Sequence, residues 1–203
     1  MRKIYTTMDK QHRLKVIAMQ YNYDIIKRIA QENPGVTIVY FWGHTPNPEK
    51  MTAACLSQWY DCGFVVDGVS YHTAEQYMMA AKARLFKDEE VLKEIMSADN
   101  PAAYKKLGRK IHGFNPARWD AVKYDIVVAG NKAKFGQNPL LKEFLLSTGD
   151  AILAEASPYD KIWGIGLNRA QALKGNVDGW KGENLLGCAL MEVREWLKEQ
   201  NEQ

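Results

Sequence analysis

The segment that most restricts the fold of this chain is 64–71, where an Asp-Gly pair joins two short alternating apolar runs. An Asp-Gly pair in such a place is typical of a tight β-hairpin, because both residues accept the positive φ that a two-residue turn requires. Directly after it, Thr73 stands three residues before Gln76, which is the spacing of a capping box at a helix N-terminus. The sequence therefore predicts a hairpin followed at once by a helix that ends near Phe86.

Three Asn-Pro dipeptides divide the second half of the chain. Each one combines an asparagine that can cap a helix with a proline suited to the first helical position. We expect the helices that they start to cover residues 101–107, 116–135 and 139–147. Gly149 is a suitable terminator for the last of them.

The remaining elements follow from residue spacing and composition. Apolar residues recur every three or four positions over 9–32, which predicts a helix, and the β-branched and aromatic run 36–41 predicts a strand. A short strand is expected at 151–156, and a closing helix begins near Glu183. The fold class is therefore α+β and predominantly helical, with a small β-hairpin or sheet packed by several helices. We divide the chain into an N-terminal helical arm, 1–35, and one domain, 36–203.

Composition excludes several classes of protein. The 203 residues carry 27 Lys and Arg against 24 Asp and Glu, and a net charge of +3 is too small for a protein that coats nucleic acid. No apolar run approaches the length of a membrane span, and the first residues lack an apolar secretory core, so we expect a cytoplasmic protein without a membrane partner. The three cysteines form no C-x-x-C pair and the four histidines lie far apart, so we expect no disulfide, no metal and no cofactor.

The common glycine-rich and nucleophile motifs are absent. The chain has no G-x-x-x-x-G-K-[ST] and no G-x-S-x-G, and the pair Gly164 and Gly166 lacks the third glycine of G-x-G-x-x-G. A P-loop NTPase, a Rossmann dehydrogenase and an α/β-hydrolase are thereby excluded.

Glu75 and Lys82 are the first candidates for chemistry. They stand seven residues apart on one predicted helix, so their side chains share a face about 10 Å apart along the axis. Lys82 has apolar neighbours on nearly all sides, and burial lowers the pKa of a lysine so that its neutral amine can attack a carbonyl. The alternative is that Lys82 reaches the surface and Glu75 only stabilises the first helical turn, and the sequence alone favours this alternative slightly.

The weak overall charge conceals an uneven distribution. Residues 100–135 hold eight basic and two acidic residues, a local charge of +6 that leaves −3 for the rest of the chain. Within this segment, Arg109 could hold phosphate oxygens in a bidentate fashion. The alternative is an ordinary solvated helix face.

Aromatic and glycine residues on irregular segments are the remaining candidates. Trp59 and Trp163 are placed where an indole can stack on a base, and Gly164 lets the backbone approach a ligand closely. Asp160 is a second carboxylate on an irregular segment. The alternatives are core packing for the tryptophans and an ordinary turn for Asp160.

Six segments in this order resemble the NADAR family, the YbiA-like N-glycosidases, over roughly residues 38–198. The segments are Leu56-Ser57-Gln58-Trp59-Tyr60, Tyr71 through Ala83, Leu107-Gly108-Arg109, Lys134-Phe135, Asp160 through Gly166, and Asn184 through Arg194. Each is weak alone, but six in order are specific.

The resemblance implies cleavage of an N-glycosidic bond between ADP-ribose, or a ribose phosphate, and an amine-bearing base. Two substrate classes follow from it: ADP-ribosyl groups on guanine in a nucleotide, DNA or RNA, and ribosylamino-pyrimidine phosphates of riboflavin synthesis. It is also compatible with a toxin–antitoxin association with an ADP-ribosyltransferase. A reader domain that binds ADP-ribose or NAD without turnover is the alternative from another class, and a sequence-specific DNA-binding protein is a distant third.

The resemblance also assigns residues to the site: Glu75, Lys82, Arg109, Asp160 and Trp163. In one mechanism Lys82 attacks C1 of the ribose and displaces the base as an aldimine, while Glu75 moves protons. Asp160 would then assist proton transfer or hold a ribose hydroxyl. In the other mechanism no covalent bond forms, and carboxylates stabilise an oxocarbenium-like state and activate water.

Overall fold

The computed structural model describes residues 21–201. Its α-helices are α2 (Tyr23–Glu32), α3 (Ala74–Leu85), α4 (Glu89–Ser97), α5 (Pro101–Gly108), α6 (Pro116–Asp120), α7 (Lys123–Gln137), α8 (Pro139–Ser147), α9 (Arg169–Ala172) and α10 (Leu185–Asn201). Its strands are β1 (Ile38–Phe41), β2 (Phe64–Val66), β3 (Val69–Tyr71) and β4 (Ile152–Glu155), and two short 3-10 helices are η1 (Ala53–Leu56) and η2 (Val177–Gly179). The expected fold class, α+β and predominantly helical, is confirmed.

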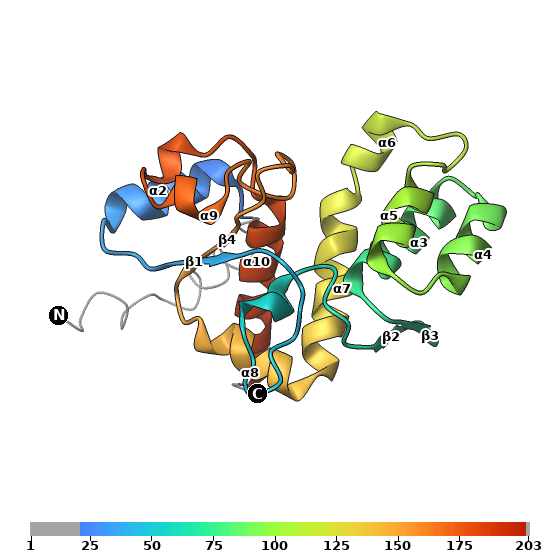
Figure 1. Ribbon diagram of the computed structural model, residues 1–203, viewed down its shortest axis with the longest axis horizontal. Helices are drawn as coiled ribbons and strands as arrows, with labels where there is room; N and C mark the ends of the chain where they lie inside the picture. The colour runs from blue at the N-terminus through green and yellow to red at the C-terminus, as the bar shows by residue number, and fades with distance from the viewer. Residues whose placement is uncertain (1–20, 202–203) are drawn as a thin grey trace.

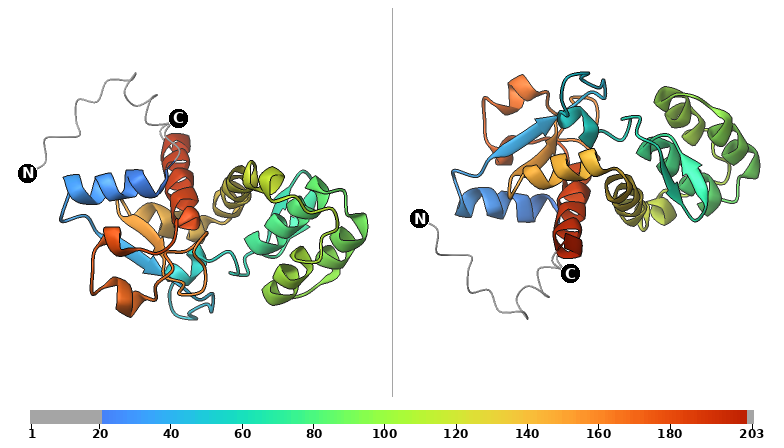
Figure 2. Two further views of the ribbon diagram at one scale, coloured as in Figure 1. Left: turned by 90° about the horizontal axis from the view of Figure 1, so that it is seen from above. Right: turned by 90° about the horizontal axis from the view of Figure 1, so that it is seen from below.

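The strands form two separate two-stranded sheets. β1 and β4 are parallel, with Ile38 opposite Ile152 and Phe41 opposite Glu155, whereas β2 and β3 form the expected antiparallel hairpin. Helix α7 runs between two groups of elements (Figure 1): the β1/β4 pair with α2, α9 and α10 lies on one side, and the hairpin with α3, α4 and α5 lies on the other. The views from above and below show the same division (Figure 2).

The hairpin and the helix after it form as their residues predict. Asp67 and Gly68 both have positive φ, 50° and 77°, as a two-residue turn requires. Thr73 caps α3 by accepting the N–H of Gln76. The Gln76 side chain reaches one residue farther back than a capping box requires, since its Oε1 accepts the N–H of His72 at 2.8 Å.

Two of the predicted helices are interrupted. In the run 9–32, residues 9–20 lie outside the described part, and α2 begins only at Tyr23, because Asn22 is extended and accepts the N–H of Ile25 as an N-cap. The run 116–135 breaks at a turn after Asp120, and Asp120 and Lys123 form an ion pair across that turn at 2.7 Å. The break separates α6 from α7 and lets them take different directions. Helix α4 was not predicted, because Asp88 caps it without a proline.

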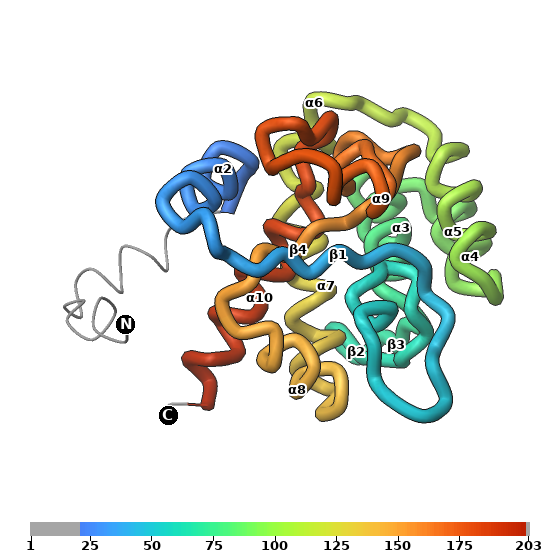
Figure 3. Tube along the Cα trace, turned by 60° about the vertical axis from the view of Figure 1, so that its left-hand side comes forward, coloured from blue at the N-terminus to red at the C-terminus, as the bar shows by residue number. Residues whose placement is uncertain are grey.

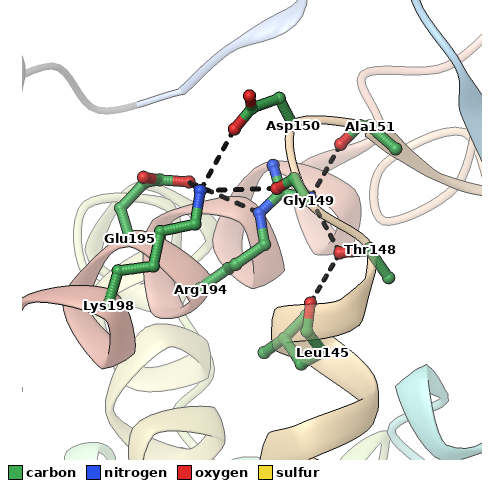
Figure 4. Close-up of polar contacts among 8 residues, drawn as sticks. All are labelled: Leu145, Thr148, Gly149, Asp150, Ala151, Arg194, Glu195 and Lys198. Atoms are coloured by element: carbon green, nitrogen blue, oxygen red, sulfur yellow. Dashed lines mark hydrogen bonds and ion pairs between the residues drawn. The ribbon is translucent and has the colours of Figure 1, made fainter. Parts of the chain in front are cut away.

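The β1/β4 pair is held against α10 by a buried arginine. Arg194 is 2% exposed, and its Nη1 donates to Ala151 O at 2.8 Å and to Thr148 Oγ1 at 2.9 Å, just before β4 begins (Figure 4). Lys198, one turn farther along α10, pairs with Asp150 in the same turn at 3.2 Å. These bonds hold β4 in place, and they thereby fix the position of its last residue, Glu155.

The trace in Figure 3 shows β1 running beside β4, with the chain between β1 and β2 descending in a long loop. That loop includes the irregular stretch expected from Gly43 to Met51. Cys55 and Cys188 are buried, Cys62 is half-buried, and all three are free thiols, as expected. Within residues 21–201, no helix has both the length and the apolar character needed to cross a bilayer.

Candidate active site

A cavity of about 600 Å³ lies where the two groups of elements meet, a size typical of small-molecule sites. Its walls come from the loop after β1, the turn after η1, helices α3, α5 and α6, and the segment after β4. The first residues after β1 and the last residue of β4 both face it, so the cavity lies at the carboxyl ends of the two parallel strands. Ligands commonly bind at that edge of parallel sheets.

Helix α3 brings Glu75 and Lys82 into this cavity together. The seven-residue spacing accounts for this, because both side chains leave the helix from the same face. Lys82 is half-buried, and its Nζ donates to Gly108 O at 2.9 Å. The Nζ lies 4.2 Å from the ring centroid of Phe114 and 5.5 Å from that of Trp119. The amine therefore lies among aromatic rings at the cavity wall, neither sealed in the core nor extended into solvent.

The pKa values of Glu75 and Lys82 shift toward their neutral forms. Burial raises the pKa of Glu75 from its ordinary 4.5 to about 7, and the cations Lys105 and Arg109 oppose this rise. Burial also lowers the pKa of Lys82, which the Glu75 carboxylate partly offsets. A carboxyl group near its titration point and an amine with a lowered pKa are suited to proton transfer and to nucleophilic attack.

The turn that carries Trp59 is fastened to two helices. Lys134 of α7 is fully buried, and its Nζ donates to Ser57 O at 2.7 Å. Asn131 donates to the Gln58 side chain at 2.9 Å, and Gln58 O accepts the N–H of Glu75 at 2.9 Å. Trp59 is thereby held at the cavity wall beside the first turn of α3.

The basic segment 100–135 is divided among several environments. Lys105 of α5 and Arg109, the residue that follows α5, line the cavity. Lys106 and Lys110 are exposed and do not line it, and Lys134 is buried behind the turn described above. Two positive side chains, not a continuous basic face, therefore reach the site.

The segment after β4 supplies Asp160 and Trp163. Asp160 Oδ1 accepts the N–H groups of Ile162 at 2.9 Å and of Trp163 at 2.8 Å, so this carboxylate first shapes its own loop. Trp163 is half-buried in the cavity wall. Gly164 is buried and does not line the cavity. A Cβ there would lie 2.9 Å from Glu155 O and 3.0 Å from Asp160 O, so close packing of the loop requires this glycine.

A family model and the relatives agree on one assignment. The NADAR domain model matches residues 40–198. The chain belongs to the NADAR family. The N-glycosidase R617 of Acanthamoeba polyphaga mimivirus is 45% identical over 161 residues, which are 77% of this chain and 95% of the relative.

Other relatives of this NADAR chain are more distant. The N-glycosidase Npun_R5314 of Nostoc punctiforme is 33% identical over 144 residues, 71% of this chain and 85% of the relative. The NMR structure of the Escherichia coli protein YbiA matches with a TM-score of 0.67 and 29% identity, covering 82% of this chain and 88% of YbiA. The resemblance seen in the six sequence segments is thereby confirmed at the level of the family and the fold.

Several residues that line the cavity were not among the candidates from the sequence. Glu155, the last residue of β4, lines the cavity, and its Oε2 is buried without a hydrogen-bond partner among the described residues. The available signal was a carboxylate that ends a short apolar strand. His44 and Trp119 also line the cavity, and Trp119 is at the same time a buried member of the hydrophobic core. In the described part of the chain, no group of three or more His, Cys, Asp or Glu side chains is arranged to hold a metal ion.

Proposed function

We propose that this chain is an N-glycosidase that releases ADP-ribose from guanine, in a nucleotide or in nucleic acid, through an aldimine on Lys82. The observation that carries the proposal is that the Lys82 amine and the Glu75 carboxyl share one cavity in a NADAR domain. The relatives R617 and Npun_R5314 are both named N-glycosidases, which supports the type of bond cleaved.

The lining of the cavity supports an ADP-ribosylated base as the substrate. Indole rings of Trp59 and Trp163 offer stacking surfaces for a base, and Lys105 and Arg109 offer positive charge to a diphosphate. The carboxyl groups of Glu75 and Asp160 line the same cavity as Lys82, and they suit the ribose that joins the base to the diphosphate. A smaller ribosylamino-pyrimidine phosphate would use the same groups but would leave part of the cavity empty.

The reaction balances with one water. The glycosidic nitrogen loses its proton as the ribose ring oxygen gains one, so the C1′–O4′ bond breaks and an imine forms at C1′. Neutral Lys82 adds to C1′, and the base nitrogen gains one proton from the Lys82 amine and one from Glu75. The C1′–N bond to the base then breaks, which releases the base with an NH2 group and leaves Lys82 as a protonated aldimine. Water then hydrolyses the Lys82 aldimine, and the ring closes to free ADP-ribose.

Borohydride trapping tests the covalent step. Wild-type protein is incubated with ADP-ribosyl-guanosine and borohydride, and peptide mass spectrometry locates any adduct. We expect reduced ADP-ribose on Lys82, no adduct and no ADP-ribose release in Lys82→Ala, and normal turnover in Lys106→Ala, which removes an exposed lysine of α5. Turnover without an adduct, together with an active Lys82→Ala, would favour the oxocarbenium mechanism.

Comparing substrates tests the specificity. ADP-ribosyl-guanosine, the same group within a DNA strand, and a ribosylamino-pyrimidine phosphate are compared by kcat/KM. The proposal requires the guanine substrates to be preferred. Binding of ADP-ribose without turnover of any of the three would instead identify a reader domain.

A further inference from the structure

Glu155 is a half-buried acid that the mechanism above does not use. It ends β4 at the cavity, and its Oε2 is buried without a hydrogen-bond partner in the part of the chain that the structure describes. A buried polar atom without a partner is costly, and nearly all such atoms in native proteins are paired. An unpaired carboxyl oxygen at a cavity wall therefore indicates a group kept for the ligand.

The backbone of Glu155 is held firmly although its side chain is not. Its N–H donates to Asn184 Oδ1 at 3.0 Å, and the same asparagine donates through Nδ2 to Leu153 O at 2.8 Å. Its carbonyl accepts the N–H groups of Ile165 and Ser157, each at 2.9 Å. Glu155 therefore stands on a rigid strand end, which is the kind of support that a reacting group needs.

The neighbours of Glu155 favour its protonated form. Burial, with the charge of Asp160 next in importance, raises its pKa from 4.5 to about 8, whereas Lys105 opposes the rise. Glu75 has a lower pKa of about 7. The pKa values of both carboxyl groups are thus raised into the neutral range, where one group can hold a proton while the other is ionised.

In the first step of the proposed reaction, the glycosidic nitrogen loses a proton while the ring oxygen O4′ gains one. If Glu75 is ionised and accepts the proton from the nitrogen, the proton for O4′ comes from a second acid. We propose that Glu155 is a further catalytic residue, the acid that gives its proton to the ribose ring oxygen as the C1′–O4′ bond breaks. Glu75 takes the proton from the nitrogen in the same step, and Glu155 recovers its own proton when the ring closes. This inference rests on the proposed function.

Glu155→Gln tests the proton transfer, since glutamine keeps the size of the side chain and cannot act as an acid. We expect kcat on ADP-ribosyl-guanosine to fall roughly 10²–10³-fold with KM changed less than about threefold. Borohydride trapping on Lys82 should slow by the same factor, because ring opening precedes the attack. Glu143→Gln, on exposed α8, is the matched control and should behave as wild type. An active Glu155→Gln would overturn the proposal.

Chemical rescue and a pH profile separate catalysis from a structural role. Formate should restore part of the activity of Glu155→Ala, and wild-type kcat should fall at alkaline pH with a limb that Glu155→Gln lacks. The titratable and charged groups that line the cavity with Glu155 are Glu75, Lys82, Lys105, Arg109, Asp160, His44 and Tyr159. Because the pKa of Glu75 is also raised into the neutral range, each pH profile is repeated in the Glu75→Gln background. No rescue together with an unchanged alkaline limb would indicate a structural role only.

An infrared measurement needs no substrate and keeps the two proposals distinguishable. At pH 7 the wild-type protein should show a protonated carboxyl band that weakens in Glu155→Gln and disappears only when Glu75→Gln is added, since the pKa of Glu75 is also raised, to about 7. An ionised Glu155 at pH 7 would overturn this inference and leave the N-glycosidase proposal standing. A protonated Glu155 in a protein that cleaves none of the three substrates would instead overturn the proposed function, and the role of Glu155 in ring opening with it.

Discussion

Burial disfavours the charged forms of the Glu75 carboxyl group and the Lys82 amine in the site. Glu75 is 7% exposed although it lies in the first turn of α3, where the helix dipole favours an ionised carboxylate. The desolvation outweighs that benefit and raises its pKa to about 7. The protein therefore accepts a cost in stability for a group that can exchange a proton near neutral pH.

The pH dependence of stability should reveal this cost. Because the folded chain binds the Glu75 proton more tightly than the unfolded chain, the contribution of this group is complete below about pH 4 and is lost as pH rises through about 7. Glu75→Gln removes the titration, so its Tm relative to wild type should rise by a few degrees between pH 5 and pH 8. Calorimetry at the two pH values measures it.

Glu143→Gln provides the control for this comparison, since Glu143 is exposed on α8, away from the cavity that holds Glu75. Its Tm difference from wild type should stay the same at both pH values. A pH-independent difference for Glu75→Gln as well would mean that the carboxyl group is already ionised at pH 5.

At the scale of elements, the site depends on how α10 meets β4. The N–H groups of Leu185 and Leu186 donate to the carbonyls of Ile162 and Trp163, so the loop that carries Trp163 satisfies the first turn of α10. Asn184, with a φ of 55°, stands at the junction and bridges Leu153 and Glu155. The predicted start near Glu183 is therefore early by two residues, because Asn184 is not helical.

Replacing Asn184 should loosen this junction. Asn184→Ala leaves Leu153 O and the Glu155 N–H without partners and places alanine at a positive φ, so we expect a loss of about 3 kcal/mol and a Tm lower by roughly 6–12 °C. Asn184→Gly loses the same bonds without the backbone strain and should be less destabilised by about 1 kcal/mol. Urea unfolding measures both. Equal stability of the two variants would show that the positive φ carries no cost.

At the scale of the whole molecule, the cavity is shared by the two groups of elements on either side of α7 (Figure 1). α3, α5 and the residue after α5 supply Lys82, Lys105 and Arg109 from one side, whereas β4 and the segment after it supply Glu155 and Asp160 from the other. The cations therefore line one side of the cavity together with Glu75 of α3, and two further carboxyl groups line the opposite side. This arrangement suits a substrate with phosphate at one end and a bond to be protonated near the other.

Removing the two cavity cations should weaken binding of a diphosphate. The double variant Lys105→Ala, Arg109→Ala is expected to raise KM for ADP-ribosyl-guanosine by roughly 10–100-fold, since each lost charged hydrogen bond costs about 1.5–3 kcal/mol in part offset by water. The dependence of kcat/KM on salt should also become shallower.

The matched control is Lys106→Ala, Lys110→Ala, which removes the same charge from exposed positions on and just after α5 that do not line the cavity. We expect a change in KM of less than about twofold. Equal effects of the two double variants would mean that long-range charge, not contact with phosphate, governs binding.

Local signals in the sequence determined most of the elements. The hairpin at 64–71, the N-cap at Thr73 and the Asn-Pro starts of α5 and α6 are each encoded within a few residues, because turn φ values and capping bonds are local. Helix α8 also starts at its predicted proline, but without a side-chain cap from Asn138. The shared face of Glu75 and Lys82 was also predictable from helical periodicity, although the sequence alone slightly favoured a Lys82 side chain that reaches the surface; the cavity that both line was not predicted.

Only the tertiary structure decided which other residues join them. Glu155 reaches the cavity because β4 pairs with β1 from more than a hundred residues away, and no local pattern records that pairing. The basic segment 100–135 shows the same dependence on packing, because Lys105 and Arg109 line the cavity whereas Lys134 is buried, and no local pattern distinguishes them. The raised pKa values of Glu75 and Glu155 likewise arise from burial, which depends on contacts distant in sequence. The sequence by itself thus determined the helices and strands and the shared face of Glu75 and Lys82. Long-range packing decided that Glu155, Lys105 and Arg109 join them at one cavity.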